Sequence, residues 1–221
     1  MMRAGSRLRP PVAPHTVSRR VAWSCRLAHD LSLTAVQSAA ALSTLRSRAS
    51  LTAQIQARGQ FSLKLLQQGL ARPTRDEAAV LGVRTGCCVW VREVALLCDQ
   101  AIVAFAHTAL PRQPRGPLSR WFAALGQRSL GTLLFAHPSF VRGDMTFKHV
   151  RSRHPLFASA HPVLAALNAE DEKTKAIVSA TAYWARRSYF TYQGRSSACA
   201  SQQSVLVTEV FAPAYLCTST L

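Results

Sequence analysis

Residues 87–110 read CCVWVREVALLCDQAIVAFAHTAL, and this stretch decides the fold class. Two apolar segments, 87–97 and 101–110, are separated only by Cys98, Asp99 and Gln100. Runs rich in valine, isoleucine and aromatic residues are typical of β-strands, and so short a gap is typical of a hairpin turn. The stretch therefore predicts two neighbouring antiparallel strands.

The sequence around this hairpin predicts a mixture of strands and helices. The segment FSLKLL (61–66) alternates apolar and polar residues, as a strand with one solvated face does. Further strands are predicted at 139–150, 182–192 and 203–211, and helices at 34–47, 51–57, 117–126 and 129–135. Because strands follow one another through short turns while helices are grouped elsewhere, we predict an α+β fold, an antiparallel sheet with helices on one face.

Two segments give no clear element. Residues 69–83, GLARPTRDEAAVLGV, are interpreted as a polar connection broken by a proline. Residues 151–179 are the hardest to interpret, and the pairs His154-Pro155 and His161-Pro162 within them indicate loops, because a residue before proline disfavours helix.

Composition and charge limit the classes of partner. With 221 residues and 48% hydrophobic residues, the chain is long enough for one domain with a full core. Its net charge of +17 favours nucleic acid, an anionic membrane surface or a small anionic ligand. The basic residues are mostly single arginines without a nucleic-acid-binding motif, and no stretch approaches the roughly 18 apolar residues of a membrane span. We therefore expect no nucleic acid partner and no stable membrane insertion.

The six cysteines and seven histidines form no pattern of metal ligands. We expect no metal site, reduced cysteines and a cytoplasmic protein, since no secretory segment is evident. Residues 1–30 are rich in arginine and serine, which fits a transit peptide as well as a disordered basic extension. We set them aside and take residues 31–221 as a single domain.

Charged residues inside the predicted strands are the candidates for a site. Glu209 lies in the apolar run VLVTEVFAP (205–213), where an unpaired carboxylate would be costly to bury. In VWVREVAL (89–96), Arg92 and Glu93 point to opposite faces, so one of them must face the core. One possibility is a cross-strand pair on an open sheet face. The other is a polar pocket shared by Arg92 and Glu209, in which the arginine binds a carboxylate and the glutamate accepts a hydrogen bond from a hydroxyl.

Five segments together resemble the bacterial chorismate pyruvate-lyase family, whose members make 4-hydroxybenzoate for ubiquinone biosynthesis. In chain order they are SLTAQIQARGQFSLKLLQQG, VWVREVALLCD, LGQRSLGTLLF, YWARRSYF and VLVTEVFAPA. The resemblance covers roughly residues 45–150 and 182–215. It departs from the family at SACASQQ, which is longer than the expected turn, and at 151–179, which has no clear counterpart.

The resemblance implies a chorismate lyase-like sheet of about six strands and a site of four residues. Arg92 matches the arginine that holds the ring carboxylate, and Glu209 matches the glutamate at the 4-hydroxyl. Leu130 matches a position whose backbone contacts the carboxylate, and Leu51 matches an apolar position on a helical flap. The implied reaction converts chorismate to 4-hydroxybenzoate and pyruvate without a cofactor, in a protein that we expect to be a monomer.

Other conspicuous residues receive structural interpretations. Arg186 and Arg187 are adjacent in a strand, so at most one can reach a ligand, and we predict a structural or surface role for both. His107 is interpreted as a core histidine with its hydrogen bonds satisfied, and Trp121 and Phe122 as the core face of a helix.

A binding module is the alternative to an enzyme. Effector-binding domains of one family of bacterial transcription regulators resemble the same fold, but they follow a winged-helix domain for which we see too little sequence here. A third hypothesis, a basic RNA-associated protein, rests on charge alone.

Overall fold

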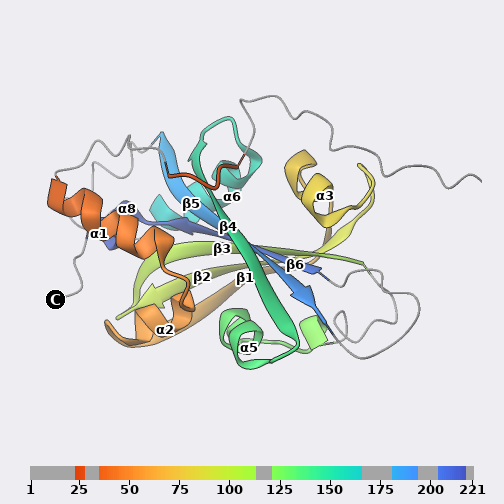
Figure 1. The fold of residues 1–221 in the computed structure, drawn as a ribbon, viewed down its shortest axis with the longest axis horizontal. Coiled ribbons are helices and arrows are strands. Elements are labelled where there is room, and N and C mark those ends of the chain that lie inside the picture. The colour runs from red at the N-terminus through yellow and green to blue at the C-terminus, as the bar shows by residue number, and fades with distance from the viewer. Residues whose placement is uncertain (1–22, 28–34, 113–120, 166–180, 194–203, 218–221) are drawn as a thin grey trace, which may run out of the picture.

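The computed structural model describes residues 23–27, 35–112, 121–165, 181–193 and 204–217. A single sheet of six antiparallel strands runs through this part of the chain, in the order β1-β2-β3-β6-β5-β4 (Figure 1). The strands are β1 (Phe61–Ala71), β2 (Val89–Cys98), β3 (Ala101–Pro111), β4 (Phe140–Arg151), β5 (Ala182–Tyr192) and β6 (Ser204–Phe211). The predicted single antiparallel sheet of about six strands is confirmed.

The central hairpin forms as its sequence predicts. Cys98 pairs with Ala101, so the turn consists of Asp99 and Gln100, which have φ angles of 48° and 68°. Positive φ at both central residues gives a turn whose twist matches that of the flanking strands. The Asp99 carboxylate accepts a hydrogen bond from the Gln60 N–H at 2.8 Å, which ties the turn to the start of β1.

A glycine makes this contact possible. A Cβ atom at Gly59 would lie 2.1 Å from the Asp99 carboxylate, which is far inside van der Waals contact. Residue 59 must therefore be glycine for the turn to dock here.

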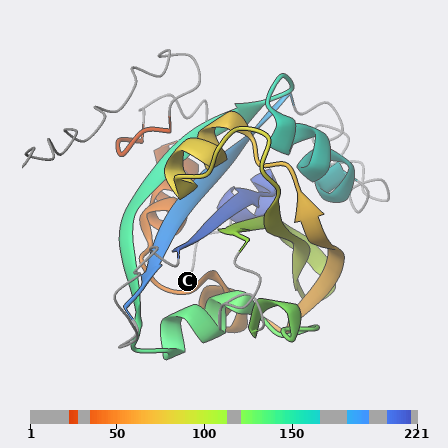
Figure 2. The same ribbon diagram turned by 90° about the vertical axis from the view of Figure 1, so that its right-hand side faces the viewer.

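The helices cover both faces of the sheet. They are α1 (Ala35–Arg46), α2 (Leu51–Gln56), α3 (Arg75–Leu81), α5 (Leu130–Ala136), α6 (Pro155–Ala165) and α8 (Pro213–Cys217). Figure 2 shows α3 and α6 on one side of the curved sheet and α5 on the other. The predicted placement of helices on one face is therefore wrong, because both faces of the central strands carry apolar side chains that need covering.

Three of these helices, α3, α6 and α8, were not predicted from the sequence. In the segment interpreted as a polar connection, Thr74 and Glu77 form a reciprocal capping box that begins α3. In the segment 151–179, Pro155 is the first residue of α6, a position where the missing N–H costs nothing. The loop interpretation of His161-Pro162 is wrong, since Pro162 lies inside α6, whereas His154 does lie in the turn before the helix.

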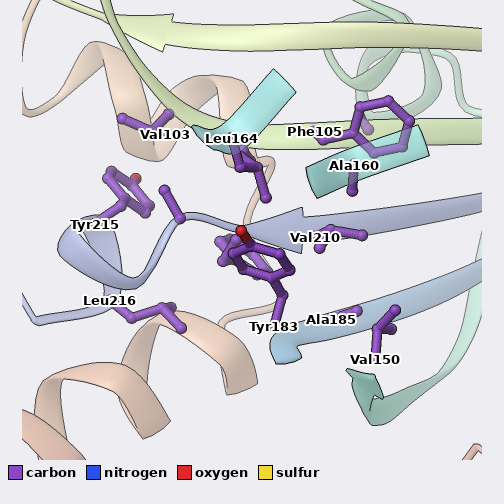
Figure 3. Close-up of a cluster of buried hydrophobic side chains, with 14 of the residues drawn as sticks. Val103, Phe105, Val150, Ala160, Leu164, Tyr183, Ala185, Val210, Tyr215 and Leu216 are labelled. Carbon is purple, nitrogen blue, oxygen red and sulfur yellow. The ribbon is translucent and has the colours of Figure 1, made fainter. Parts of the chain in front are cut away.

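The largest core cluster includes the packing of α6 against the sheet. Phe105 of β3 and Val210 of β6 face Ala160 and Leu164 of α6, as Figure 3 shows. The Tyr183 hydroxyl in this cluster lies 2.8 Å from Nδ1 of His161, so its polar end is satisfied. Helix α6 thus covers one face of the sheet, and the pocket described below lies on the other face.

Part of the N-terminal stretch that we set aside packs on the domain. Ser24 exchanges backbone hydrogen bonds with Phe147 of β4, at 3.0 and 2.8 Å. The Trp23 indole N–H donates to Asp76 at 2.7 Å. Residues 23–27 therefore extend the sheet edge and contact α3. The predicted helix 117–126 lies partly outside the described residues; of its core residues, Phe122 and Leu125 are buried.

Candidate active site

A pocket lies on the face of the sheet opposite α6, under α2 and α5. It has about 590 Å³ of empty space, part of which is open to solvent. Strand residues form its floor, and α2 and α5 provide Leu51, Thr52 and Leu130. Its charged lining residues are Arg92, Arg142, Arg186 and Glu209.

Arg92 stands at the β2 side of the pocket. Arg92 is 2% exposed. Its guanidinium donates hydrogen bonds to Oε1 of Gln68 at 2.6 Å and to the Arg128 carbonyl oxygen at 3.2 Å. Burial lowers the pKa of Arg92. Both partners are neutral, so the charge of this arginine is held in place without a counter-ion among the described residues.

Glu209 lies in the pocket floor, and its contacts show how the cost of burying its carboxylate is offset. It pairs across strands with Arg186, whose Nε–H donates to the Glu209 carboxylate. Arg186 also donates to the carbonyl oxygens of Thr44 at 3.2 Å and Ser47 at 2.9 Å. The carboxylate is therefore compensated by a buried arginine that is itself fixed by the end of α1.

The helical cover of the pocket is tied together by hydroxyl groups. Thr52 of α2 and Ser129, the N-cap of α5, have their oxygens 2.7 Å apart. Leu51 directly precedes Thr52, and Leu130 directly follows Ser129. These two leucines are 3% and 7% exposed. At Gly131 a Cβ atom would lie 3.4 Å from both Ser50 and Thr52, so the two helices meet closely there. Two apolar side chains thus cover a polar floor.

Arg142 stands at the β4 side of the pocket. The register of β4 against β5 shifts between Arg142 and Met145, which is a bulge. The guanidinium donates to Ser188 Oγ from Nε at 3.1 Å and from one terminal nitrogen at 2.6 Å, and to the Arg48 carbonyl at 2.6 Å. In the sequence, nothing distinguishes this residue from any other arginine in a segment expected to be extended.

All four site residues predicted from the sequence line this one pocket: Arg92, Glu209, Leu130 and Leu51. We predicted a structural or surface role for Arg186 and Arg187. They are 0% and 2% exposed, so the surface alternative is wrong for both. Sequence reasoning also missed that Arg186 lines the pocket, although the alternation of strand residues requires one of the two arginines to face this side.

The opposite face of the same strands carries a separate ionic network. Arg187 contacts Asp76 of α3 at 2.8 Å and Glu77 at 3.7 Å. His107 lies between Glu77 at 3.2 Å and Glu93 at 2.9 Å, which agrees with its interpretation as a core histidine. Burial alone would lower the pKa of His107, but the two glutamates outweigh it and raise the pKa to about 9. The cross-strand pair that we considered for β2 is therefore made by Glu93, and Arg92 faces the pocket.

The chemistry of the site favours an anionic small molecule. Three guanidiniums face one carboxylate, so the described lining carries an excess of two positive charges in a partly enclosed space. No cluster of three or more potential metal ligands occurs within the described residues. No helix in the same residues is both long and apolar enough to cross a membrane. The charge of this lining is therefore suited to a small organic anion.

Comparisons with known proteins identify the family. The sequence profile described as chorismate lyase matches residues 18–219, so the chain belongs to the chorismate lyase family. A probable chorismate pyruvate-lyase from Dechloromonas aromatica is 44% identical over 166 residues, 75% of this chain and 82% of that protein. Another from Nitrosospira multiformis is 39% identical over 174 residues, 78% of this chain and 86% of that protein. The resemblance stated from the five sequence segments is confirmed.

Solved structures with a similar arrangement are more distant. The C-terminal domain of the histidine utilization repressor from Pseudomonas syringae aligns with a TM-score of 0.43 and 9% identity, over 71% of this chain and 94% of that domain. A likeness at this level does not bear on function.

Proposed function

We propose that this protein is a chorismate pyruvate-lyase, which converts chorismate to 4-hydroxybenzoate and pyruvate without a metal or an organic cofactor. One observation carries the proposal: an arginine without a counter-ion, Arg92, and a carboxylate held by a buried arginine, Glu209, face the same covered pocket. Family membership supports the same activity. Chorismate presents a ring carboxylate and a 4-hydroxyl at opposite ends of its ring, which these two residues match.

The reaction is an elimination whose product is aromatic. The C4–H bond breaks and its electron pair forms the C3=C4 double bond, while the C3–O bond breaks and its electrons leave with the enolpyruvyl oxygen. The C4 proton is balanced by a proton that the enolpyruvate takes up at its methylene carbon, which gives pyruvate. Because aromatisation supplies the driving force, the protein needs to orient the substrate, exclude water and stabilise the departing charge.

The residues of the pocket have distinct roles in this proposal. Arg92 binds the ring carboxylate with two parallel N–H groups, and Glu209 accepts a hydrogen bond from the 4-hydroxyl. Arg186 fixes the Glu209 carboxylate and is a positioning residue. Leu51 and Leu130 cover the ring and exclude water, and the backbone of Leu130 contacts the carboxylate.

A direct assay tests the proposal. Purified full-length protein is incubated with chorismate, pyruvate is followed by a coupled dehydrogenase, and 4-hydroxybenzoate is quantified by chromatography. We expect equal amounts of both products and the same rate with or without EDTA. If the protein binds 4-hydroxybenzoate but releases no pyruvate, it is a binding module and the lyase proposal is refuted.

A further inference from the structure

Two guanidiniums in the pocket have no carboxylate partner among the described residues. Arg186 is paired with Glu209, whereas Arg92 and Arg142 are held by neutral oxygens only. Arg92 is buried and Arg142 is half-buried. Removing an arginine from water without a counter-ion costs stability, and a bound anion would offset that cost. The pocket therefore has two positions for anionic groups, and the proposed function so far uses only the one at Arg92.

Arg142 is rigidly held and points into the pocket. Its guanidinium carbon lies 5.1 Å from the centre of the Phe135 ring and 5.7 Å from that of Phe190. Together with Ser188 and the Arg48 carbonyl, these rings hold the guanidinium on several sides. Burial lowers the pKa of Arg142 to about 10, so the group stays protonated at neutral pH.

Part of the hydrogen-bonding capacity of Arg142 remains available. A guanidinium has five N–H groups, and the contacts to Ser188 and Arg48 engage one on Nε and one on each terminal nitrogen. Within the described part of the chain, one N–H on each terminal nitrogen is therefore unused. Two N–H groups on the terminal nitrogens are suited to the two oxygens of a carboxylate.

The strand order places Arg142 on the far side of Glu209 from Arg92. Arg92 is on β2, Glu209 on β6 and Arg142 on β4, in a sheet ordered β1-β2-β3-β6-β5-β4. The Glu209 carboxylate also stabilises the protonated form of Arg142, because it opposes the lowering of the Arg142 pKa by burial. A ligand whose carboxylate lies at Arg92 and whose hydroxyl lies at Glu209 thus has its next substituent beside Arg142.

We propose that Arg142 binds the carboxylate of the enolpyruvyl group of chorismate. This inference rests on the proposed function. The enolpyruvyl ether is on C3, next to the C4 hydroxyl, so its carboxylate lies near Glu209 when the ring carboxylate is bound by Arg92. When the C3–O bond breaks, the electron pair moves to the enolate oxygen and is conjugated with that carboxylate. Arg142 is therefore a catalytic residue that binds the substrate and stabilises the leaving group, whereas the product 4-hydroxybenzoate lacks the group that it holds.

The test compares two ligands that differ only in this group. Calorimetry measures the affinity of full-length protein for 4-hydroxybenzoate and for its 3-(1-carboxyvinyloxy) derivative, an aromatic dianion that cannot undergo the elimination. In wild-type protein we expect the dianion to bind more tightly. Arg142→Gln should lower dianion affinity roughly 10- to 100-fold and leave 4-hydroxybenzoate affinity within about two-fold. Arg142→Lys should recover part of the loss.

The control and the possible outcomes keep the two proposals apart. Arg151→Gln removes the same charge from the exposed end of the same strand and should change neither affinity. If Arg142→Gln weakens both ligands equally, its role is structural and the inference is overturned, even with an active wild-type enzyme. If the wild-type protein releases no pyruvate but the dianion preference depends on Arg142, the subsite stands and the lyase proposal fails.

Discussion

The buried His107 network predicts a loss of stability at alkaline pH. The histidine is 7% exposed and lies between Glu77 and Glu93, which raise its pKa from 6.5 to about 9. Because the folded-state pKa lies above the unfolded one, the contribution to stability is fully present below pH 6.5 and is lost as pH rises through 9. A difference of this size corresponds to roughly 3 kcal/mol, at about 1.4 kcal/mol for each pH unit.

Urea unfolding at several pH values measures this contribution. The free energy of unfolding of wild-type protein should fall by roughly 3 kcal/mol between pH 6.5 and 9.5, relative to the His107→Gln variant. The variant should also be less stable near pH 6.5, because two carboxylates lose their partner. His137→Gln is the matched control, since His137 is exposed. Parallel pH profiles of wild-type and His107→Gln protein would refute the reasoning.

Three further predictions concern the pocket and the hairpin. Arg92→Ala should weaken 4-hydroxybenzoate binding by on the order of 2 to 4 kcal/mol, and Arg92→Lys should recover only part of it, because the bidentate contact is lost; calorimetry checks both. Glu209→Gln should reduce the rate of pyruvate release on the order of 100-fold while the variant still binds 4-hydroxybenzoate; an unchanged rate would exclude a role for the carboxylate. Gly59→Ala should lower the free energy of unfolding by about 1 to 3 kcal/mol, since the new Cβ would displace Asp99 from its hydrogen bond to Gln60, and Gly69→Ala, at a site with open space, is its control in thermal unfolding.

The sequence predicted the strands better than the helices. The hairpin strands and β6 have β-branched runs, and a two-residue turn joins the hairpin strands. This local pattern is enough to define them. The helix α3 follows Pro73 and has only seven residues, so its capping box is the main local signal for it. Inside α6 the prolines suggest loops, yet burial of Leu156, Phe157 and Leu164 stabilises the helix. Tertiary packing decided these helices, and local patterns do not report it.

The sequence predicted part of the candidate site. Charged residues inside apolar strands identified Arg92 and Glu209, because burial of an unpaired charge needs an explanation. Family resemblance added Leu51 and Leu130. Arg186 and Arg142 could not be assigned in this way, since the face to which each points depends on the register of β5 and on the bulge in β4. Residue type alone gives no information about either.

The distribution of charge on the two sheet faces explains how one strand can serve stability and ligand binding together. Arg187 faces α3, where Asp76 and Glu77 compensate its charge inside the protein. Arg186 faces the pocket and is compensated by Glu209, which leaves Arg92 and Arg142 with neutral partners only. Holding these two groups costs stability in the ligand-free protein, and the far-face network and the core against α6 offset that cost. Under the proposed function a dianionic ligand supplies the missing charges. Because neutral partners already orient both guanidiniums, little reorganisation would oppose the reaction.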